Sequence, residues 1–240
     1  MEIRRFFVSP DAICDGVVTI CGDEFLHMTK VLRYKAGYKA IVCANDGIER
    51  LCTVKSVLKD SAILTVDEQN VQDKKNVHVT LFAGVLKNNK LDFAVQKAVE
   101  LGVDVFVPFV SQNCAETKFA TERANKIALE SAKQCGSAYL TEVENVISFD
   151  DMLKRFSAFD RVLFAYENEK KNRIKDCDLA GKRIALVVGA EGGFTWEEAE
   201  KAKAAGAQIV TLGKRILRAE TASIVSCALL LDTLGELDYD

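Results

Sequence analysis

The sequence predicts a two-domain α/β protein, in which a small β-rich domain precedes a larger domain built on a parallel sheet. Short apolar runs, separated by turn residues, occupy the first part of the chain. Farther along, longer apolar runs alternate with stretches of helical periodicity. A polar segment without a hydrophobic pattern, residues 69–77, lies between the two parts and is the expected linker. We therefore expect domains at residues 1–73 and 74–240.

The first domain is expected to contain four strands and one helix. The strands are VVTI at 17–20, AIVC at 40–43, LCTVKSVL at 51–58 and AILTV at 62–66. Short strands broken by turn residues such as Asn45-Asp46-Gly47 are typical of a small barrel or sandwich. Residues 24–33 carry apolar side chains, Val31 among them, at helical spacing, and Asp23 is placed to cap that helix.

The second domain is expected to alternate strands with helices. The strands cover 79–86, 105–110, 162–166, 184–189 and 208–213, and the helices cover 91–102, 121–136, 149–158, 195–206 and 221–235. Near-continuous hydrophobic strands between helices imply a parallel sheet that is covered on both faces. Glycines stand where four of these helices should end, at Gly102, Gly136, Gly206 and Gly235.

The composition, with 49% hydrophobic and 28% charged residues, is that of an ordinary globular protein. No apolar run reaches the ~18 residues that span a bilayer, and MEIRRFFVSPD lacks the apolar core of a secretory signal. We therefore expect a cytoplasmic protein without a membrane segment. The net charge of −3 disfavours a broadly basic nucleic-acid binder but permits local basic patches.

The eight cysteines are scattered, and none forms a C-x-x-C pair. The two histidines, His27 and His78, lie far from any cysteine cluster. Because zinc sites need clustered ligands, we expect no metal site. We expect the cysteines to behave as small buried apolar residues.

A glycine-rich turn, VVGAEGGFTWEEAE at 187–200, follows a predicted strand. Gly189, Gly192 and Gly193 would let a ligand approach bare backbone amides at the carboxyl edge of the sheet, and Thr195 is placed to cap the next helix. The turn is neither a dinucleotide fingerprint nor a Walker motif, and its Glu-rich helix start would repel a phosphate. On these residues alone, a tight turn and a ligand site are equally favoured.

A basic turn lies in TLGKRILRAETASIVSCALLL, residues 211–231, between a strand end and a long apolar helix that should begin near residue 220. Arg215 and Arg218 fall in this turn rather than on the helix. They could reach into a site, or they could cap sheet carbonyls or pair with Glu191 or Glu220. The residues leave both interpretations open.

The two turns, VGAEGGF at 188–194 and LGKRILRAETA at 212–222, resemble the C-terminal signatures of the RsmE family in the SPOUT superfamily of methyltransferases. The family usually has proline where this chain has Ala190 and Lys214. The similarity extends to RRFF at 4–7, HMTKVLR at 27–33 and KNNKLDFAVQKAVELGVDVFVPF at 87–109. It therefore covers most of the chain.

The resemblance implies a PUA-like β-barrel that helps to hold RNA and a C-terminal α/β domain with a trefoil knot. It also implies a homodimer that uses S-adenosylmethionine to methylate uracil N3 in 16S ribosomal RNA of the small subunit. The cofactor would contact matching positions in three loops. These positions are Leu163, Ala165, Glu167, Gly189, Gly192, Gly193, Leu212, Gly213, Ile216, Leu217 and Thr221.

The resemblance also suggests catalytic and RNA-binding residues. Arg218 would stabilise the developing uracil anion or fix the nucleotide phosphate, and Glu191 would stand near the methyl donor or orient Arg218. Contacts to RNA phosphates would come from basic residues, whose alternative is a solvated surface. These are Arg4, Arg5, Lys30, Arg33, Lys87, Lys90 and Arg215.

The chain departs from the family pattern in its middle segment. Asn113 stands where the family has arginine, and Lys133 and Ser137 stand where it has glutamate and arginine. RNA grip or target choice could differ as a result. Two alternatives therefore remain open: a SPOUT methyltransferase with another RNA target, and a catalytically inactive homologue that binds the ribosome.

Overall fold

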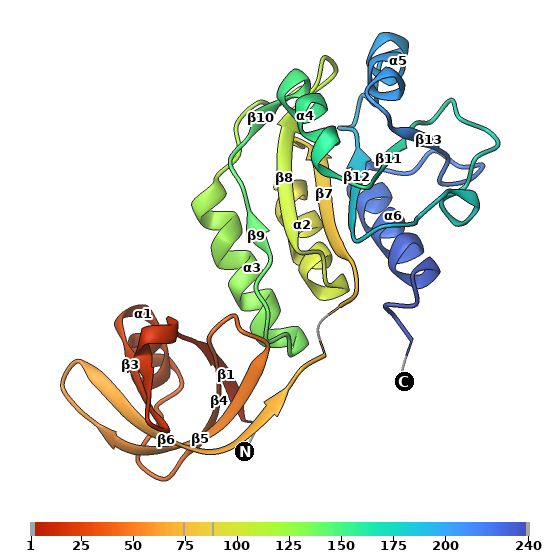
Figure 1. Ribbon diagram of the computed structural model, residues 1–240. Helices are drawn as coiled ribbons and strands as arrows, with labels where there is room; N and C mark the ends of the chain where they lie inside the picture. Colours follow the sequence, from red (N-terminus) through yellow and green to blue (C-terminus); the bar gives the residue numbers. More distant parts are fainter. Residues whose placement is uncertain (1–2, 74, 88, 239–240) are drawn as a thin grey trace. The chain divides into compact units, whose positions relative to one another are not determined.

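The computed structural model of the chain describes residues 3–73, 75–87 and 89–238 (Figure 1). The chain divides into two compact units. The first comprises Met1–Lys74 with Ala132–Leu140, and the second comprises Lys75–Ser131 with Thr141–Asp240. Each unit has its own hydrophobic core, and each is described by itself below.

The first unit is built on a sheet with the strand order β1-β4-β5-β6-β3-β2. Its strands are β1 Arg4–Phe7, β2 Ile13–Cys14, β3 Val17–Cys21, β4 Lys39–Cys43, β5 Ile48–Val57 and β6 Ser61–Val71. All four predicted strands are present, and β6 extends into the predicted linker as far as Val71. The strands β1 and β2 were not predicted. The pairing of β1 with β4 is parallel, whereas the other pairs are antiparallel.

The predicted helix at residues 24–33 is shorter and changes type. It consists of α1 Gly22–Leu26 followed by the π-helical turn η2 His27–Val31. The prediction that Asp23 caps it was wrong, because the N-cap is Cys21 and Asp23 lies inside the first turn. The wider π turn also shifts the helical periodicity. Met28 is buried as expected, but Val31 is 66% exposed.

Residues 132–140 bond to the strands and loops of the first unit. Gln72 donates its amide to the Gly136 carbonyl at 2.7 Å and accepts from the Ala138 amide at 2.8 Å. The ammonium of Lys133 pairs with Glu24 at 2.5 Å. The Ser137 hydroxyl donates to the backbone carbonyl of Tyr139 at 2.7 Å. Two of the three departures from the family pattern, at Lys133 and Ser137, therefore hold contacts inside this unit.

The second unit contains the predicted parallel sheet, with the strand order β10-β8-β7-β12-β11-β13 and β9 paired to β8. Its strands are β7 His78–Gly84, β8 Val105–Val110, β9 Glu142–Val143, β10 Ile147–Ser148, β11 Arg161–Ala165, β12 Arg183–Val188 and β13 Gln208–Val210. Every strand pair is parallel, which confirms the prediction. The strand β13 ends three residues before its predicted end, and Thr211 forms only an isolated bridge to Arg173.

Helices cover both faces of this sheet (Figure 1). They are α2 Lys90–Leu101, α3 Thr121–Cys135, α4 Phe149–Arg155, α5 Trp196–Ala204 and α6 Ala219–Thr233. Apolar residues of α4 and α5 pack against strand residues that point to one face of the sheet, such as Phe164 of β11 and Val187 of β12. On the other face, α2 and α6 pack against each other, and α6 also contacts β7 and β12. The four glycines predicted at helix ends all have positive φ, between +72° and +98°, and Gly102 is the C-cap of α2. The helix predicted at 149–158 is shorter, because α4 ends at Arg155 and the 3-10 turn η3 Phe156–Ala158 follows. Among the described residues, no helix is long and apolar enough to cross a membrane.

Candidate functional site

The glycine-rich turn, residues 189–195, joins the end of β12 to the start of α5. Gly193 has φ +61°, a backbone conformation that favours glycine, and a Cβ there would collide with the carboxylate of Glu167. A Cβ on Gly192 would lie only 2.7 Å from the Cβ of Asn113. The loops after β11 and β8 therefore both lie directly against this turn. Three loops meet at the carboxyl edge of the parallel sheet, where such folds bind ligands.

A fourth strand reaches the same place. Gly84 is the last residue of β7, and a Cβ on it would collide with the backbone nitrogen of Ala190. The turn can cross the end of β7 only because Gly84 has no side chain. Gly84 could not be identified as part of the site from the sequence, because an isolated glycine at the end of an apolar run carries no motif.

Phe194 anchors the turn in the hydrophobic core. Its side chain is 4% exposed, and its ring centroid lies 4.1 Å from that of Phe164 and 6.1 Å from that of Phe109. Thr195 caps α5 as predicted, because its hydroxyl accepts from the Glu198 amide at 3.2 Å. In return Glu198 Oε2 accepts from the Thr195 amide at 3.0 Å, which completes a capping box. Loss of such a cap costs about 1 kcal/mol of stability.

Glu191 lies in the turn and is exposed. Its Oε1 accepts from the Lys87 amide at 3.2 Å and lies 3.5 Å from the Lys90 ammonium. The structure thus brings together three residues that the sequence placed in two different roles. In the described part of the chain no ion pair joins Glu191 to Arg218, so the expectation that Glu191 orients Arg218 is not met here. The exposed pair with Lys90 contributes little stability of its own, ~0–1 kcal/mol.

The basic turn between β13 and α6 is open to solvent. Arg218 is the N-cap residue of α6 and has extended backbone angles, which confirms its place outside the helix. The helix begins at Ala219, so Thr221 lies within its first turn. In the part of the chain that the structure describes, the side chains of Arg215 and Arg218 are exposed and make no hydrogen bond or ion pair. The alternative in which they pair with carboxylates or cap sheet carbonyls therefore has no support.

Two further features of this turn suit a ligand. Ile216 is 89% exposed, which is unusual for so large an apolar side chain. Among the residues that the structure describes, the buried Oε2 of Glu220, in the first turn of α6, has no hydrogen-bond partner. Buried acceptors of this kind are rare, and a hydroxyl or amino group of a ligand could satisfy one. Sequence analysis considered Glu220 only as a partner for the arginines.

The predicted positions on β11 differ in their access to this edge. Leu163 is fully buried, and its strand is flanked on both sides, with Leu163 opposite Leu186 of β12 and Gln208 of β13. Leu163 therefore supports the sheet, and a direct cofactor contact is disfavoured because its side chain and backbone are already engaged. Ala165 ends the strand and Glu167 lies beyond it, so both are placed at the edge.

The basic residues predicted to contact RNA phosphates in the first unit differ in their exposure. Arg5 pairs with Glu49 at 2.5 Å and donates to the Cys43 sulfur at 3.1 Å, and its side chain is only 9% exposed. It is a structural ion pair and not a free surface cation, which corrects the expectation. Lys30 and Arg33 are exposed, as is Arg4. Lys30 and Arg33 remain candidates for an RNA surface.

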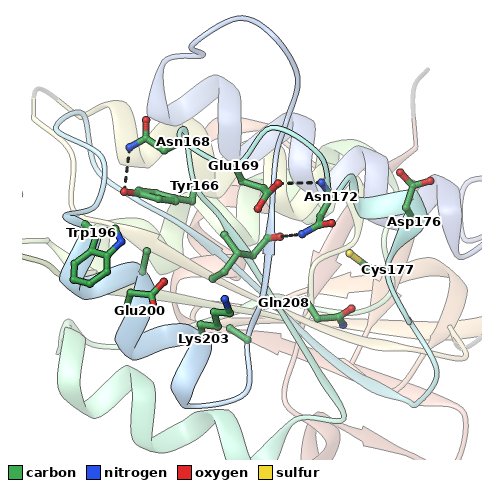
Figure 2. A pocket seen from close by; sticks show the side chains of 13 residues that line it. Tyr166, Asn168, Glu169, Asn172, Asp176, Cys177, Trp196, Glu200, Lys203 and Gln208 are labelled. Carbon is green, nitrogen blue, oxygen red and sulfur yellow. Dashed lines mark hydrogen bonds between the residues drawn. The ribbon is translucent and has the colours of Figure 1, made fainter.

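A pocket of about 790 Å³ lies beside β13 and α5 (Figure 2). Its lining comprises Tyr166, Asn168, Glu169, Asn172, Asp176, Cys177, Trp196, Ala199, Glu200, Lys203, Ala207, Gln208 and Ile209. No residue that the sequence assigned to the cofactor is among them. This pocket therefore does not coincide with the predicted cofactor positions.

The cysteines follow the expectation only in part. Cys43, Cys52 and Cys227 are buried, whereas Cys14, Cys21 and Cys135 are exposed. Burial raises the pKa of the Cys227 thiol to about 12, so this thiol is neutral and inert. Among the described residues, no group of three or more His, Cys, Asp and Glu side chains is placed to hold a metal ion.

Comparison with known proteins identifies similar chains. A family model described as an RNA methyltransferase domain matches residues 73–231, and one described as an RNA methyltransferase PUA domain matches residues 20–67. A Bacillus subtilis (strain 168) protein, ribosomal RNA small subunit methyltransferase E, is 33% identical over 220 residues, covering 86% of each chain. A Rickettsia conorii protein of the same name is 28% identical over 242 residues, covering 95% of each chain.

A solved structure has the same fold along nearly the whole chain. The ribosomal RNA small subunit methyltransferase E of Neisseria gonorrhoeae, bound to S-adenosyl methionine, superposes with a TM-score of 0.86. The two sequences are 25% identical, and the superposition covers 96% of this chain and 98% of the other.

Proposed function

Because this chain belongs to the RNA methyltransferase family, we propose that it methylates uracil N3 of a uridine in 16S ribosomal RNA of the small subunit, with S-adenosylmethionine as methyl donor. The observation that carries the proposal is the convergence of the loops after β8 and β11 on the glycine-rich turn that follows β12. The relatives named above as small-subunit rRNA methyltransferases support the substrate, and the solved structure with its bound cofactor supports the donor.

The residues at this edge fit S-adenosylmethionine. Gly84 and Gly192 let the end of β7 and the loop after β8 pack directly against the glycine-rich turn, which fixes the backbone that would face the cofactor. The unpartnered Oε2 of Glu220 can accept from a hydroxyl or amino group. Ile216 offers an apolar surface that a purine face would cover. When bound, the cofactor supplies an electrophilic methyl group on a sulfonium. Methyl transfer then depends chiefly on how the chain positions the two reactants.

In the proposed mechanism Arg218 acts on the target base. Uracil N3 must release its proton to water, and negative charge develops on the ring before the new N–C bond forms. The methyl group would come from the sulfonium, whose S–CH3 bond breaks to leave a neutral thioether. A guanidinium held at the mouth of the site stabilises that charge, and its planar fork can bind two acceptors. The proton points into a base pair in a duplex, so the uridine has to be unpaired or flipped out of its stack. Glu191, with Lys90 beside it, lines the same edge.

We also propose that the polypeptide forms a trefoil knot here. The segment after β13 runs beside the connection between β11 and β12: the Thr211 amide donates to the Asn172 carbonyl at 2.8 Å. Farther on, α6 packs against η4, Ile174–Asp176, which belongs to that same connection. A trefoil knot requires the C-terminal segment to be threaded through an earlier loop, and these contacts between that segment and the β11–β12 connection support the proposal. Knots are nearly absent from proteins outside a few families.

The proposal assigns further roles to surfaces of the chain. Residues 1–73 would hold RNA through Arg4, Lys30 and Arg33, and residues 74–240 would carry catalysis, with Lys87 and Arg215 as additional phosphate contacts. A homodimer would form through α2 and α6, where Phe93 is 47% and Leu229 42% exposed. Large exposed apolar side chains on packed helices are typical of an interface. The cytoplasm, where ribosomes assemble, is the proposed location.

The test is mass spectrometry of modified nucleosides in 16S rRNA from cells with and without the gene, together with calorimetry of S-adenosylmethionine binding. We expect 3-methyluridine to disappear with the gene and the purified protein to bind the cofactor. Loss of a different methylated nucleoside would favour another RNA target. Absence of any change, with no cofactor binding, would favour an inactive homologue that binds the ribosome.

A further inference from the structure

Glu198 holds two different loops through one buried carboxylate. Glu198 is only 6% exposed, although it lies in the first turn of α5 beside charged and exposed residues. Oε2 accepts from the Thr195 amide at 3.0 Å, and Oε1 accepts from the Gln112 amide at 2.8 Å. In the described part of the chain no ion pair involves Glu198. The two carboxylate oxygens are instead bonded by backbone N–H groups, and the position in the first turn of α5 is one where the helix dipole favours a carboxylate.

The second contact is more than a helix cap. Capping requires only the bond to Thr195, whereas Gln112 belongs to the loop after β8, 86 positions away in sequence. A second bond joins the same two loops, because the Asn113 side-chain amide donates to the Gly192 carbonyl at 3.0 Å. The glycine-rich turn is thus fastened to the loop after β8 near its middle, at Gly192, and at its end, at Thr195.

Fastening matters because the turn is rich in glycine. Glycine residues have large conformational freedom, and a ligand that orders them loses affinity through the entropy of ordering. Bonds that already hold the backbone in one arrangement reduce that loss. The two ties fix the path of the turn backbone before any ligand binds.

We propose that Glu198 is a positioning residue, which together with Asn113 holds the glycine-rich turn in the arrangement that binds S-adenosylmethionine. This inference rests on the proposed function. It assigns Glu198 no contact with the cofactor; the carboxylate acts through Thr195 and Gln112. It also gives Asn113, which stands where the family has arginine, a defined role in this chain.

The chain offers matched variants for a test. Glu198→Gln is isosteric but has a single acceptor oxygen, so one of the two N–H donors faces an NH2 group. Asn113→Ala removes the second tie at an exposed side chain. Thr195→Ala removes half of the capping box and leaves the bond between Glu198 and Gln112 in place. Glu197→Gln makes the same charge change in the same helical turn at an exposed position.

The measurements are cofactor affinity by calorimetry, thermal melting, and hydrogen exchange of residues 111–114 and 189–195 in the ligand-free protein. We expect Glu198→Gln and Asn113→Ala each to weaken binding by about tenfold or more and to speed exchange in both segments. Thr195→Ala should lower the melting temperature yet bind within about threefold of wild type, and Glu197→Gln should match wild type.

The inference is overturned if Glu198→Gln binds the cofactor within about twofold of wild type, or if Thr195→Ala weakens binding as much as Glu198→Gln does. In the second case helix stability alone would account for the effect. If Glu198→Gln fails to fold, Asn113→Ala decides by the same criteria. Failure of the wild-type protein to bind would refute the proposed function instead, and exchange in the ligand-free protein would still show whether the ties hold the turn.

Discussion

The carboxylate of Glu191 lies 3.5 Å from the ammonium of Lys90, so the glycine-rich turn is joined to the start of α2 by an ion pair on the protein surface. The same carboxylate oxygen accepts from the Lys87 amide at 3.2 Å. Both contacts hold the loop between β7 and α2 against the turn. If Glu191 also faces the methyl donor, mutation can separate its role in holding the loop from its role in methyl transfer.

We therefore predict different effects for the two partners. Lys90→Ala should change the free energy of unfolding by less than about 1 kcal/mol, because exposed ion pairs contribute little. Glu191→Gln should have a similarly small effect on stability but should lower methylation by about tenfold or more. Urea unfolding and single-turnover methylation measure the two quantities. Equal and small effects of both variants on methylation would return Glu191 to a purely structural role.

Gly192→Val should abolish S-adenosylmethionine binding while the circular dichroism spectrum stays largely native. A Cβ at this position would lie 2.7 Å from the Cβ of Asn113 and 2.9 Å from its carbonyl oxygen, so the loop after β8 must move. Calorimetry checks the prediction. Gly206→Ala is a control for glycine substitution in the same unit, because a Cβ on Gly206 meets nothing within 4 Å. Normal cofactor binding by Gly192→Val would show that the pocket is misplaced.

The homodimer is predicted to depend on Leu229, which is 42% exposed on α6. Leu229→Glu would bury a charge in the interface and should yield monomers at micromolar concentration in sedimentation equilibrium. Leu58→Glu, a matched change at a 53% exposed leucine of the first unit, should leave the assembly unchanged. A wild-type protein that is already monomeric would contradict the proposed dimer.

The buried thiol of Cys227 predicts a pH dependence of stability. Burial raises its pKa from 9.0 to about 12, so the neutral thiol is favoured in the folded state. The contribution is fully present below pH 9 and decreases as pH rises from 9 towards 12, where the unfolded chain ionises first. Between pH 8 and 10.5 the free energy of unfolding should decrease by about 2 kcal/mol through this thiol. Urea unfolding should show that Cys227→Ala lacks this decline, whereas Cys14→Ala, at an exposed thiol, retains it.

The parallel sheet could be predicted from sequence because each central strand is a nearly continuous apolar run, and such runs occur where both faces of a sheet are covered. The strand β1 could not, since Arg4 and Arg5 give it a charged sequence. It forms only by pairing with β4, more than 30 residues away. A long sequence separation is also the reason why the role of Arg5 could not be predicted. Two adjacent arginines are typical of a surface patch, but Glu49, 44 positions along the chain, binds one of them.

The candidate site was predictable where a local motif marked it. The glycines and the basic turn follow strand ends, and parallel strands bring such turns to one edge. The contributions of Gly84, Asn113 and Glu198 were not predictable. Gly84 is needed because another backbone crosses it, and Glu198 has a second partner 86 positions away. A single sequence shows neither relationship, because both arise only when distant loops pack together.

Arg218 is predicted to act in catalysis and not in stability. It is exposed at the N-cap of α6, and removal of a charge that acts chiefly in the transition state should lower turnover by about 10²-fold or more while cofactor binding persists. Arg218→Lys should rescue little, because a lysine lacks the planar fork. Arg215→Ala is the control for loss of charge in the same turn, because loss of one phosphate contact weakens RNA binding but leaves turnover of the bound RNA intact. A fall in melting temperature as large as the loss of activity would instead favour a structural role.

The central claim, methylation of uracil N3 with Arg218 as the catalytic cation, is tested most directly in cells that lack the gene. Their 16S rRNA would be digested and its nucleosides quantified by mass spectrometry after complementation with wild type, Arg218→Ala or Arg215→Ala. The account predicts that wild type and Arg215→Ala restore 3-methyluridine and that Arg218→Ala, at equal protein level, does not. Restoration by Arg218→Ala, or 3-methyluridine that never depended on the gene, would contradict it.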